Sequence, residues 1–239
     1  MSDYKNDYLT HIKECMDYIV DKEADRIDEA ASLMHECVKS NHRIFFFGTG
    51  HSYILSQEVF ARAGGYAQFV PILEDELCMN HAYKSTLIER TPEYAKVILG
   101  LYDFRKDDVI VMISHSGRNG LIIELALELK KRGLYIIAVT SLDASKNNTS
   151  RHPSGYRLYE LADVILDTRS IDGDAYIKHN ERISTGPTST VLGSFMIQLV
   201  VTAFVEKELA TDPNVPVFIS SNVDEGDAWN EALFEAYKK

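Results

Sequence analysis

Seven consecutive residues in the middle of the chain have the side chains and backbone freedom that bind an anion. They are Ser114, His115, Ser116, Gly117, Arg118, Asn119 and Gly120. An apolar run precedes them, and a helical pattern that ends at Gly133 follows. Hydroxyl and backbone N–H groups therefore gather at a predicted helix N-terminus, where the helix dipole favours negative charge. A single helix cap needs only one such residue, so the pattern favours a phosphate site over an ordinary cap.

The same arrangement occurs once more, nearer the start of the chain. A strand-like run at residues 43–47 leads into Gly48, Thr49, Gly50, His51 and Ser52, and a helical pattern follows at 53–63. Glycine lets the backbone turn sharply and approach a ligand closely. In open α/β sheets, ligands bind beyond the carboxyl ends of the strands. Two such units in one small domain predict a shared site at that edge of a sheet.

The strands that must position these turns are predicted from their apolar runs. We expect strands at residues 43–47, 68–72, 109–113, 135–140 and 163–167. The run at 109–113 is apolar throughout, which is typical of a strand buried on both faces of a parallel sheet. The predicted fold class is therefore α/β.

Helices are predicted from apolar residues at helical spacing. They are expected at residues 4–39 with a break near Glu23, at 91–101, at 121–132, at 191–209 and from Asp227 onward. Residues 74–90 and 143–153 are expected to be irregular. We expect one domain, with an N-terminal helical arm at 1–40, a core at 41–210 and a C-terminal tail and helix at 211–239.

Composition restricts the classes of function. The chain has 239 residues and a formal net charge of −11, which argues against binding nucleic acid or an anionic membrane surface. We see no 18-residue apolar run and no signal peptide, so no membrane span is expected. The cysteines Cys15, Cys37 and Cys78 lack metal-ligand spacing. Reduced thiols, a cytoplasmic location and the absence of a metal or other cofactor are the expectations.

The segment ISHSGRNGLIIELALELKKRGLYIIAVTS, which begins at Ile113, resembles the signature of the sugar isomerase (SIS) domain. The upstream FFFGTGHS resembles the first glycine-rich turn of that domain. The resemblance covers roughly residues 40–209, and the whole chain, with its SNVDEGD tail, is similar to phosphosugar-binding proteins related to phosphoheptose isomerases. It implies a three-layer sandwich around a five-stranded parallel sheet, a sugar phosphate ligand and a homodimer or homotetramer.

Carried over by position, the resemblance implies that both turns hold the phosphate. The implied phosphate-binding residues are Gly50, Ser52, Ser114, His115, Ser116, Gly117 and Asn119. His115 and Gly117 would contribute backbone N–H groups, and Asn119 stands where many relatives have threonine. This set suits a phosphate monoester, whose terminal oxygens need several donors.

The catalytic residues of the family are not matched. Phosphoheptose isomerases use a His and a Glu four residues apart on the first helix, and the corresponding positions here hold Glu58 and Arg62. The N-acetylmuramic acid 6-phosphate etherases place a Glu near the position of Arg62. Relatives of glucosamine-6-phosphate synthase use a Glu and a His before a late helix, where this chain has His179 and Glu181.

Aldose–ketose isomerisation needs a base that moves a proton and an acid that opens the ring. The candidates are Glu58, His51 and His179. The alternatives are a surface pair between Glu58 and Arg62 and an ordinary loop histidine at position 51. His81 and His179 either reach the site of a partner subunit or are solvated.

We therefore expect a phosphosugar-binding protein that is an isomerase or lyase working by proton transfer. A non-catalytic phosphosugar sensor is the alternative, and a structural oligomer with an empty site is a third class. Four polar residues in the tail have side chains that suit a site for a metal ion or a sugar hydroxyl. They are Asn222, Asp224, Asp227 and Asn230. The alternative is that the third of them, Asp227, caps the last helix.

Overall fold

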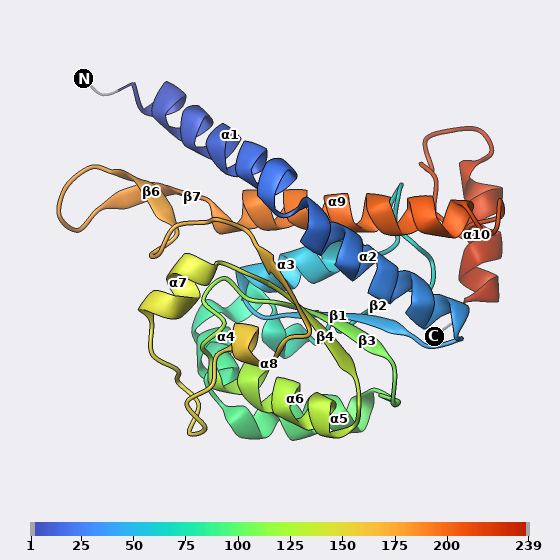
Figure 1. Cartoon of the computed structure of the whole chain (residues 1–239), viewed down its shortest axis with the longest axis horizontal. Helices are drawn as coiled ribbons and strands as arrows, with labels where there is room; N and C mark the ends of the chain where they lie inside the picture. The colour runs from blue at the N-terminus through green and yellow to red at the C-terminus, as the bar shows by residue number, and fades with distance from the viewer. Residues whose placement is uncertain (1–2, 238–239) are drawn as a thin grey trace.

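In a computed structural model of the protein, which describes residues 3–237, five parallel strands form one sheet in the order β2-β1-β3-β4-β5 (Figure 1). The strands are β1 Ile44–Gly48, β2 Val70–Pro71, β3 Val109–Ile113, β4 Tyr135–Thr140 and β5 Val164–Asp167. This confirms the predicted α/β class and the five-stranded parallel sheet. The edge strand β2 is shorter than the expected 68–72, although the Ile72 N–H still donates to the Phe46 carbonyl at 2.9 Å.

Helices cover both faces of the sheet, as expected for a three-layer sandwich (Figure 1). One face carries α1 Tyr4–Lys22, α2 Ala24–Lys39, α3 His51–Glu58 and α9 Ser189–Leu209. The other carries α4 Ala82–Glu89, α5 Ala95–Leu101, α6 Gly120–Lys131 and α8 Leu158–Leu161. Side chains alternate between the two cores along β1, where Phe46 faces the first layer and Phe45 the second.

The N-terminal arm consists of two helices that meet at Glu23, as the sequence predicts. The Glu23 carboxylate accepts a hydrogen bond from the backbone N–H of Asp167 at 3.2 Å, which fastens the joint of the arm to the end of β5. The core helix α9 is long and apolar enough to cross a membrane by length and composition alone. Here its residues Leu192, Met196 and Phe204 are buried in the first layer.

Three segments contain more regular structure than expected. Residues 74–90 form the 3-10 turns η1 Asp75–Leu77 and η2 Met79–His81 followed by α4. The expected loop at 143–153 begins with α7 Leu142–Asn147, and a hairpin of β6 Ala175–Lys178 and β7 Ser184–Pro187 precedes α9. The hairpin packs beside α1, where the Tyr8 hydroxyl donates to the Pro187 carbonyl at 2.7 Å. The 3-10 helix η3 Pro92–Tyr94 leads into α5.

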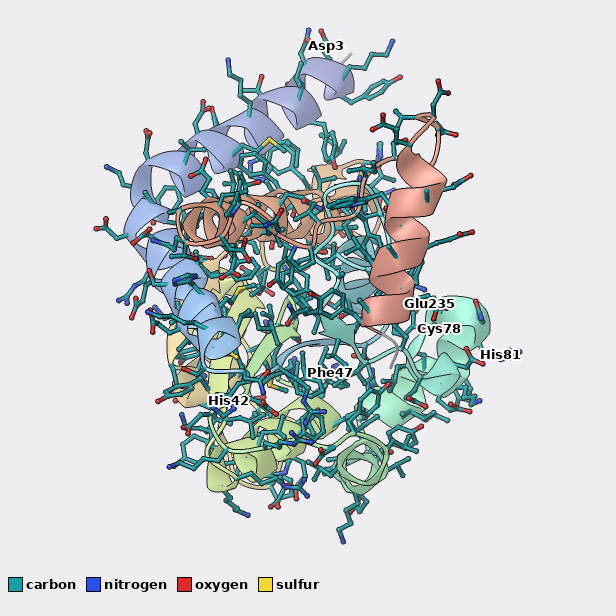
Figure 2. All side chains as sticks on the ribbon, turned by 90° about the vertical axis from the view of Figure 1, so that its right-hand side faces the viewer. Asp3, His42, Phe47, Cys78, His81 and Glu235 are labelled. Carbon is teal, nitrogen blue, oxygen red and sulfur yellow. The ribbon has the colours of Figure 1, made fainter. Side chains whose placement is uncertain are left out.

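The C-terminal helix α10 spans Gly226–Ala236 and stands at one end of the molecule (Figure 2). Its N-cap is Glu225, and Asp227 lies in the first turn rather than at the cap. The buried Asn230 amide accepts from the N–H of Ile219 at 3.1 Å and donates to the Ile219 carbonyl at 2.9 Å. Asn230 therefore holds the tail against the helix.

Candidate functional site

The two polar turns lie next to each other because β1 and β3 are neighbours in register, with Gly48 opposite Ile113. The chain continues from β1 to β2 on one side and from β3 to β4 on the other, so this is the switch point at which ligands bind in doubly wound sheets. A Cβ atom on Gly48 would lie 2.4 Å from the Ser52 carbonyl oxygen. Only glycine therefore allows α3 to start so close to the strand.

A pocket lies beyond the carboxyl ends of β3 and β4, between the first turns of α3 and α9. The space that it encloses is small, about 20 Å³, which is roughly what one water molecule needs. Hydroxyl and imidazole groups form much of its wall. The lining residues are His51, Ser52, Leu55, Ile113, His115, Val139, Thr140, Thr168, Ser189, Thr190 and Gly193.

His115 has one satisfied and one unsatisfied ring nitrogen. Its Nδ1 lies 3.0 Å from the Ser170 hydroxyl oxygen, whereas its Nε2 is buried and has no hydrogen-bond partner among the described residues. Burial lowers the pKa of His115, although Asp174 and Asp172 act in the opposite direction. The imidazole is thus neutral near pH 7, and a neutral imidazole can either accept or donate a proton.

Asp174 fixes the first turn of α9 at the pocket wall. Its carboxylate accepts from the Ser189 N–H at 2.7 Å, from the Ser189 hydroxyl at 2.9 Å and from the Thr188 N–H at 2.9 Å. Burial by itself would raise the pKa of Asp174, but these hydrogen bonds together lower it. The resulting carboxylate caps the helix and holds the Ser189 hydroxyl at the pocket wall.

The turn after β3 is anchored by its own backbone. The His115 carbonyl accepts from the Thr140 hydroxyl at 3.1 Å and from the Ser141 N–H at 3.0 Å, which ties the turn to the end of β4. The Ser114 hydroxyl accepts from the Gly117 N–H at 3.1 Å. Gly117 has a φ of +56°, and a Cβ there would lie 3.1 Å from Leu158 Cβ. The turn is therefore rigid before any ligand arrives.

Two arginines lie beside Asn119, namely Arg118 in the turn after β3 and Arg151 in the loop after α7, and the sequence analysis did not single out Arg151. Asn119 is the N-cap of α6, and its Oδ1 accepts from Arg151 Nη1 at 2.9 Å. Arg118 donates to Asn148 at 2.9 Å, and its Nε is buried with no partner among the described residues. In the described part of the chain, neither Arg118 nor Arg151 lies within 4.0 Å of a carboxylate.

These guanidinium groups are close enough to act on one another. Burial lowers the pKa of Arg151, and the charges of Arg118 and Arg90 lower it further. Positive charge thus accumulates at the N-terminus of α6 in a chain that is strongly acidic overall. Arg118 was visible inside the polar turn, but nothing in the local sequence indicates that Arg151 folds back beside it.

The three catalytic candidates lie in different surroundings. His51 is exposed at the start of α3 and lines the pocket with His115. Glu58 forms an ion pair with Arg62 and accepts from Gln198 Nε2 at 3.4 Å, so the surface pair considered as its alternative is present. His179 is exposed in the hairpin and lies 2.9 Å from the Thr185 hydroxyl. Its catalytic role stays a prediction, as do those of His51 and Glu58.

His81 is exposed at the rim of the molecule (Figure 2). The implied phosphate-binding residues that border the pocket directly are Ser52 and His115, and the other five lie in the same two turns. Among residues 3–237, no group of three or more His, Cys, Asp or Glu side chains is arranged to hold a metal ion.

Residues 7–141 match the family model of the SIS domain. The UPF0309 protein lin2794 of Listeria innocua is 38% identical over 236 residues, covering 98% of this chain and 96% of that protein. The UPF0309 protein OB3413 of Oceanobacillus iheyensis is 38% identical over 240 residues, covering 98% and 97%.

Solved structures share the fold at low sequence identity. Phosphoheptose isomerase GmhA from Neisseria gonorrhoeae superposes with a TM-score of 0.55 at 16% identity, covering 85% of this chain and 98% of that chain. A phosphoheptose isomerase from Francisella tularensis gives a TM-score of 0.54 at 13% identity, covering 86% and 100%. The parallel sheet, the two polar turns at its switch point and these matches place the chain, with the UPF0309 proteins, in the SIS domain family.

Proposed function

We propose that this protein binds a sugar phosphate at the switch point between β1 and β3 and moves a proton on the bound sugar, as an isomerase or lyase. The observation that carries the proposal is the His115 ring at the wall of the pocket, whose buried Nε2 has no partner within 3.5 Å among the described residues, although the Ile171 backbone also acts on the ring. A buried imidazole nitrogen without a partner is costly, and such groups concentrate where a ligand completes the hydrogen bond.

The phosphate would be held by the two turns. The N-terminus of α6 and the hydroxyls of Ser52, Ser114 and Ser116 offer donors, and Arg118 and Arg151 offer counter-charge. The names of the two structural relatives, both phosphoheptose isomerases, support a sugar phosphate as the ligand class.

The sugar would lie over the mouth of this small pocket, where His115 and His51 are the proposed acid–base pair. A neutral His115 accepts a proton from a sugar carbon through Nε2 while Ser170 holds the ring by Nδ1. His51, which also lines the pocket, would protonate a sugar oxygen. Of the hydroxyls that line the pocket, that of Thr190 is available to bind a sugar hydroxyl, whereas Ser189 already donates to Asp174 and Thr168 is bonded to Ser170.

The first test is a thermal-shift screen of sugar phosphates and their unphosphorylated parents, followed by turnover of every phosphate-dependent hit. Ser116→Ala should weaken the binding of a hit by about 1–2 kcal/mol, the usual worth of a hydrogen bond to a charged group. Ser40→Ala, at the opposite edge of the sheet, is the matched control and should bind normally. Unchanged affinity in Ser116→Ala would place the phosphate elsewhere.

His115→Gln separates catalysis from binding. We expect it to bind the ligand and to lose at least about 100-fold in turnover, the usual range for a general acid or base. Wild-type turnover in His115→Gln would remove His115 from the mechanism. The exposed His179→Gln is its control within this chain, and a loss of activity there would instead support a role for the hairpin histidine.

A non-catalytic phosphosugar sensor is the second candidate function. The ion pair of Glu58 with Arg62, at the positions where phosphoheptose isomerases have a His and a Glu, favours it. Binding of a sugar phosphate by the wild type without turnover of any binder would establish it. We also propose a homodimer or homotetramer, which light scattering after size exclusion tests directly.

A further inference from the structure

One carboxylate lies between the two turns that are proposed to hold the phosphate. Glu89 is the last residue of α4, and its Oε2 accepts from the Thr49 hydroxyl at 3.3 Å. The same oxygen would lie 3.9 Å from a Cβ atom on Gly50. The Asn119 side chain also forms a hydrogen bond with Glu89. Glu89 therefore contacts the turn after β1 and the N-cap of α6 at once.

This is an unfavourable place for a negative charge. Glu89 is in the last turn of its helix, where the dipole repels anions, and it is partly buried. Among the described residues, no Lys, Arg or His nitrogen lies within 4.0 Å of its carboxylate. Burial raises its pKa, whereas Thr49, Arg90, Arg151 and Asn119 act in the opposite direction.

An anionic ligand would remove much of the remaining support for this charge. The two charged groups that stabilise the Glu89 carboxylate are Arg90 and Arg151, and Arg151 is bonded to Asn119 at the proposed phosphate site. A phosphate beside Asn119 would share these guanidinium groups and add a like charge close to Glu89. Like charges that share a site cannot both remain ionised at little cost, so one of them takes up a proton.

Resting on the proposed function, we infer that Glu89 takes up a proton when the ligand's phosphate binds, and that its acid form then occupies the site beside the phosphate. Protonation converts a repulsive neighbour into one that can donate a hydrogen bond. Binding is therefore strongest at low pH and weakens as the pH rises between the pKa values of Glu89 in the free and the bound protein. The structure thereby ties ligand affinity to a side chain outside the pocket.

The test uses inorganic sulfate as the probe, because a phosphate ester itself titrates near pH 6 (second pKa about 6) and sulfate does not. The dissociation constant of sulfate is measured by NMR titration of the backbone amides of the whole protein from acid to alkaline pH. One coupled proton predicts a change of about tenfold in affinity per pH unit within the responsive range.

Glu89→Gln should bind sulfate more tightly than the wild type at alkaline pH, with the pH dependence due to Glu89 removed. This variant also separates Glu89 from His51 and His115, whose protonation would strengthen anion binding in any variant. The matched control is Glu93→Gln, an exposed carboxylate in η3 that should keep the wild-type profile. A Glu89→Gln profile equal to the wild type, or weaker binding in that variant, would overturn the inference.

The sulfate titration also distinguishes failure of the site from failure of the proton coupling. If sulfate leaves the amides of the turn after β3 unperturbed, the proposed phosphate site itself fails. If sulfate perturbs them with a flat wild-type pH profile, the site stands and the proton coupling fails. Should Glu89→Gln not fold, the side-chain carboxyl carbon of Glu89 is followed by NMR in Glu93→Gln; its titration midpoint must rise when sulfate is added, and an unchanged midpoint overturns the inference.

Discussion

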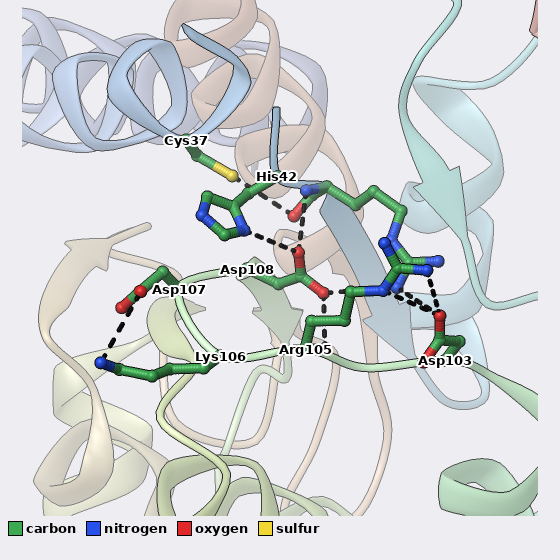
Figure 3. A network of polar contacts seen from close by, with 8 residues as sticks. Cys37, His42, Asp103, Arg105, Lys106, Asp107 and Asp108 are labelled. Atoms are coloured by element: carbon green, nitrogen blue, oxygen red, sulfur yellow. Dashed lines mark hydrogen bonds and ion pairs between the residues drawn. The ribbon is translucent and has the colours of Figure 1, made fainter. Parts of the chain in front are cut away.

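The amino and carboxyl ends of the parallel strands differ in how a buried carboxylate is held, by an ion pair and two backbone donors at Asp108 and by hydrogen bonds without an ion pair at Glu89. At the amino edge, Asp108 is completely buried and accepts from the Arg43 N–H at 2.9 Å and the Arg105 N–H at 2.8 Å (Figure 3). Its carboxylate also lies 3.7 Å from His42 Nδ1 and 3.6 Å from Arg43 Nη2. Both carboxylate oxygens accept hydrogen bonds from the chain itself, whereas Nε and Nη2 of Arg43 are buried without a hydrogen-bond partner among the described residues.

At the carboxyl edge, three ionisable groups lack a hydrogen-bond partner or an ion pair among residues 3–237. His115 Nε2 and Arg118 Nε are buried without a partner in the described part of the chain, and Glu89 has hydrogen bonds but no ion pair there. Ionisable groups whose hydrogen bonds are made within the chain stabilise the fold, whereas buried groups that lack a partner can bind a ligand. We therefore expect substitutions at the first edge to change stability and those at the second to change binding.

The largest expected loss of stability follows from removing the carboxylate at the amino edge. Asp108→Ala should lower the free energy of unfolding by about 3–5 kcal/mol, because two backbone donors and a guanidinium lose a buried partner. Urea denaturation measures this. The control is Asp107→Asn, which removes a neighbouring exposed carboxylate and tolerates the φ of +68°. Equal, small losses in both variants would mean that the two edges do not differ.

A smaller loss is expected where the site meets the core. Gly117→Ala combines a left-handed φ with a crowded Cβ position, so it should cost about 1–3 kcal/mol of stability and should weaken ligand binding. Gly155→Ala is the matched control, since Gly155 has a φ of +78° with open space around its Cβ position. If both alanines cost the same, the close packing of the turn against Leu158 contributes nothing.

The pH dependence of stability sharpens the comparison at His115. The pKa of His115 is lower in the folded protein than in the unfolded protein, where it is about 6.5. When the pH falls through this value, the unfolded state therefore binds more protons than the folded state. The stability of the wild type should fall as the pH is lowered through this range, and His115→Gln should lose less. The free energy of unfolding at about pH 7.5 and about pH 5.5, on either side of that value, checks this for both proteins. A larger loss in the variant would contradict the assignment.

The smallest effect is expected at Glu58. Its pair with Arg62 joins the last residue of α3 to the loop that follows, and exposed ion pairs of this kind contribute about 0.2–1 kcal/mol. Glu58→Gln should therefore leave stability and turnover nearly unchanged. A large loss of turnover in a stable Glu58→Gln protein would restore Glu58 as the catalytic base.

Local patterns were sufficient to predict the sheet and the turns. The apolar run at β3, the polar turn after it and the joint at Glu23 each depend on neighbours in the sequence, so periodicity and composition reveal them. The family resemblance implied a five-stranded parallel sheet, which is confirmed, but the pairing of β1 with β3 is seen only in the structure.

Contacts between distant segments were not predictable in this way. Thr49 and Glu89 are 40 residues apart, and Asn119 and Arg151 are 32 apart, so no local pattern links the members of either pair. The hairpin was missed for a related reason. Its Gly186–Pro187 end reads as a turn, and its packing partner is α1, where His11 stacks on Tyr176 with ring centroids 3.8 Å apart.

Asp174 joins two parts of the molecule that otherwise belong to different layers. It precedes the first residue of the hairpin, and through Thr188 and Ser189 it grips the residues that follow the hairpin. The base of the hairpin is thus closed into a short ring by one side chain. Because Asp174 bonds to Thr188 and Ser189, we expect a force on the hairpin to reach the first turn of α9, which forms part of the pocket wall. A displacement of the hairpin is therefore expected to move the pocket wall as well.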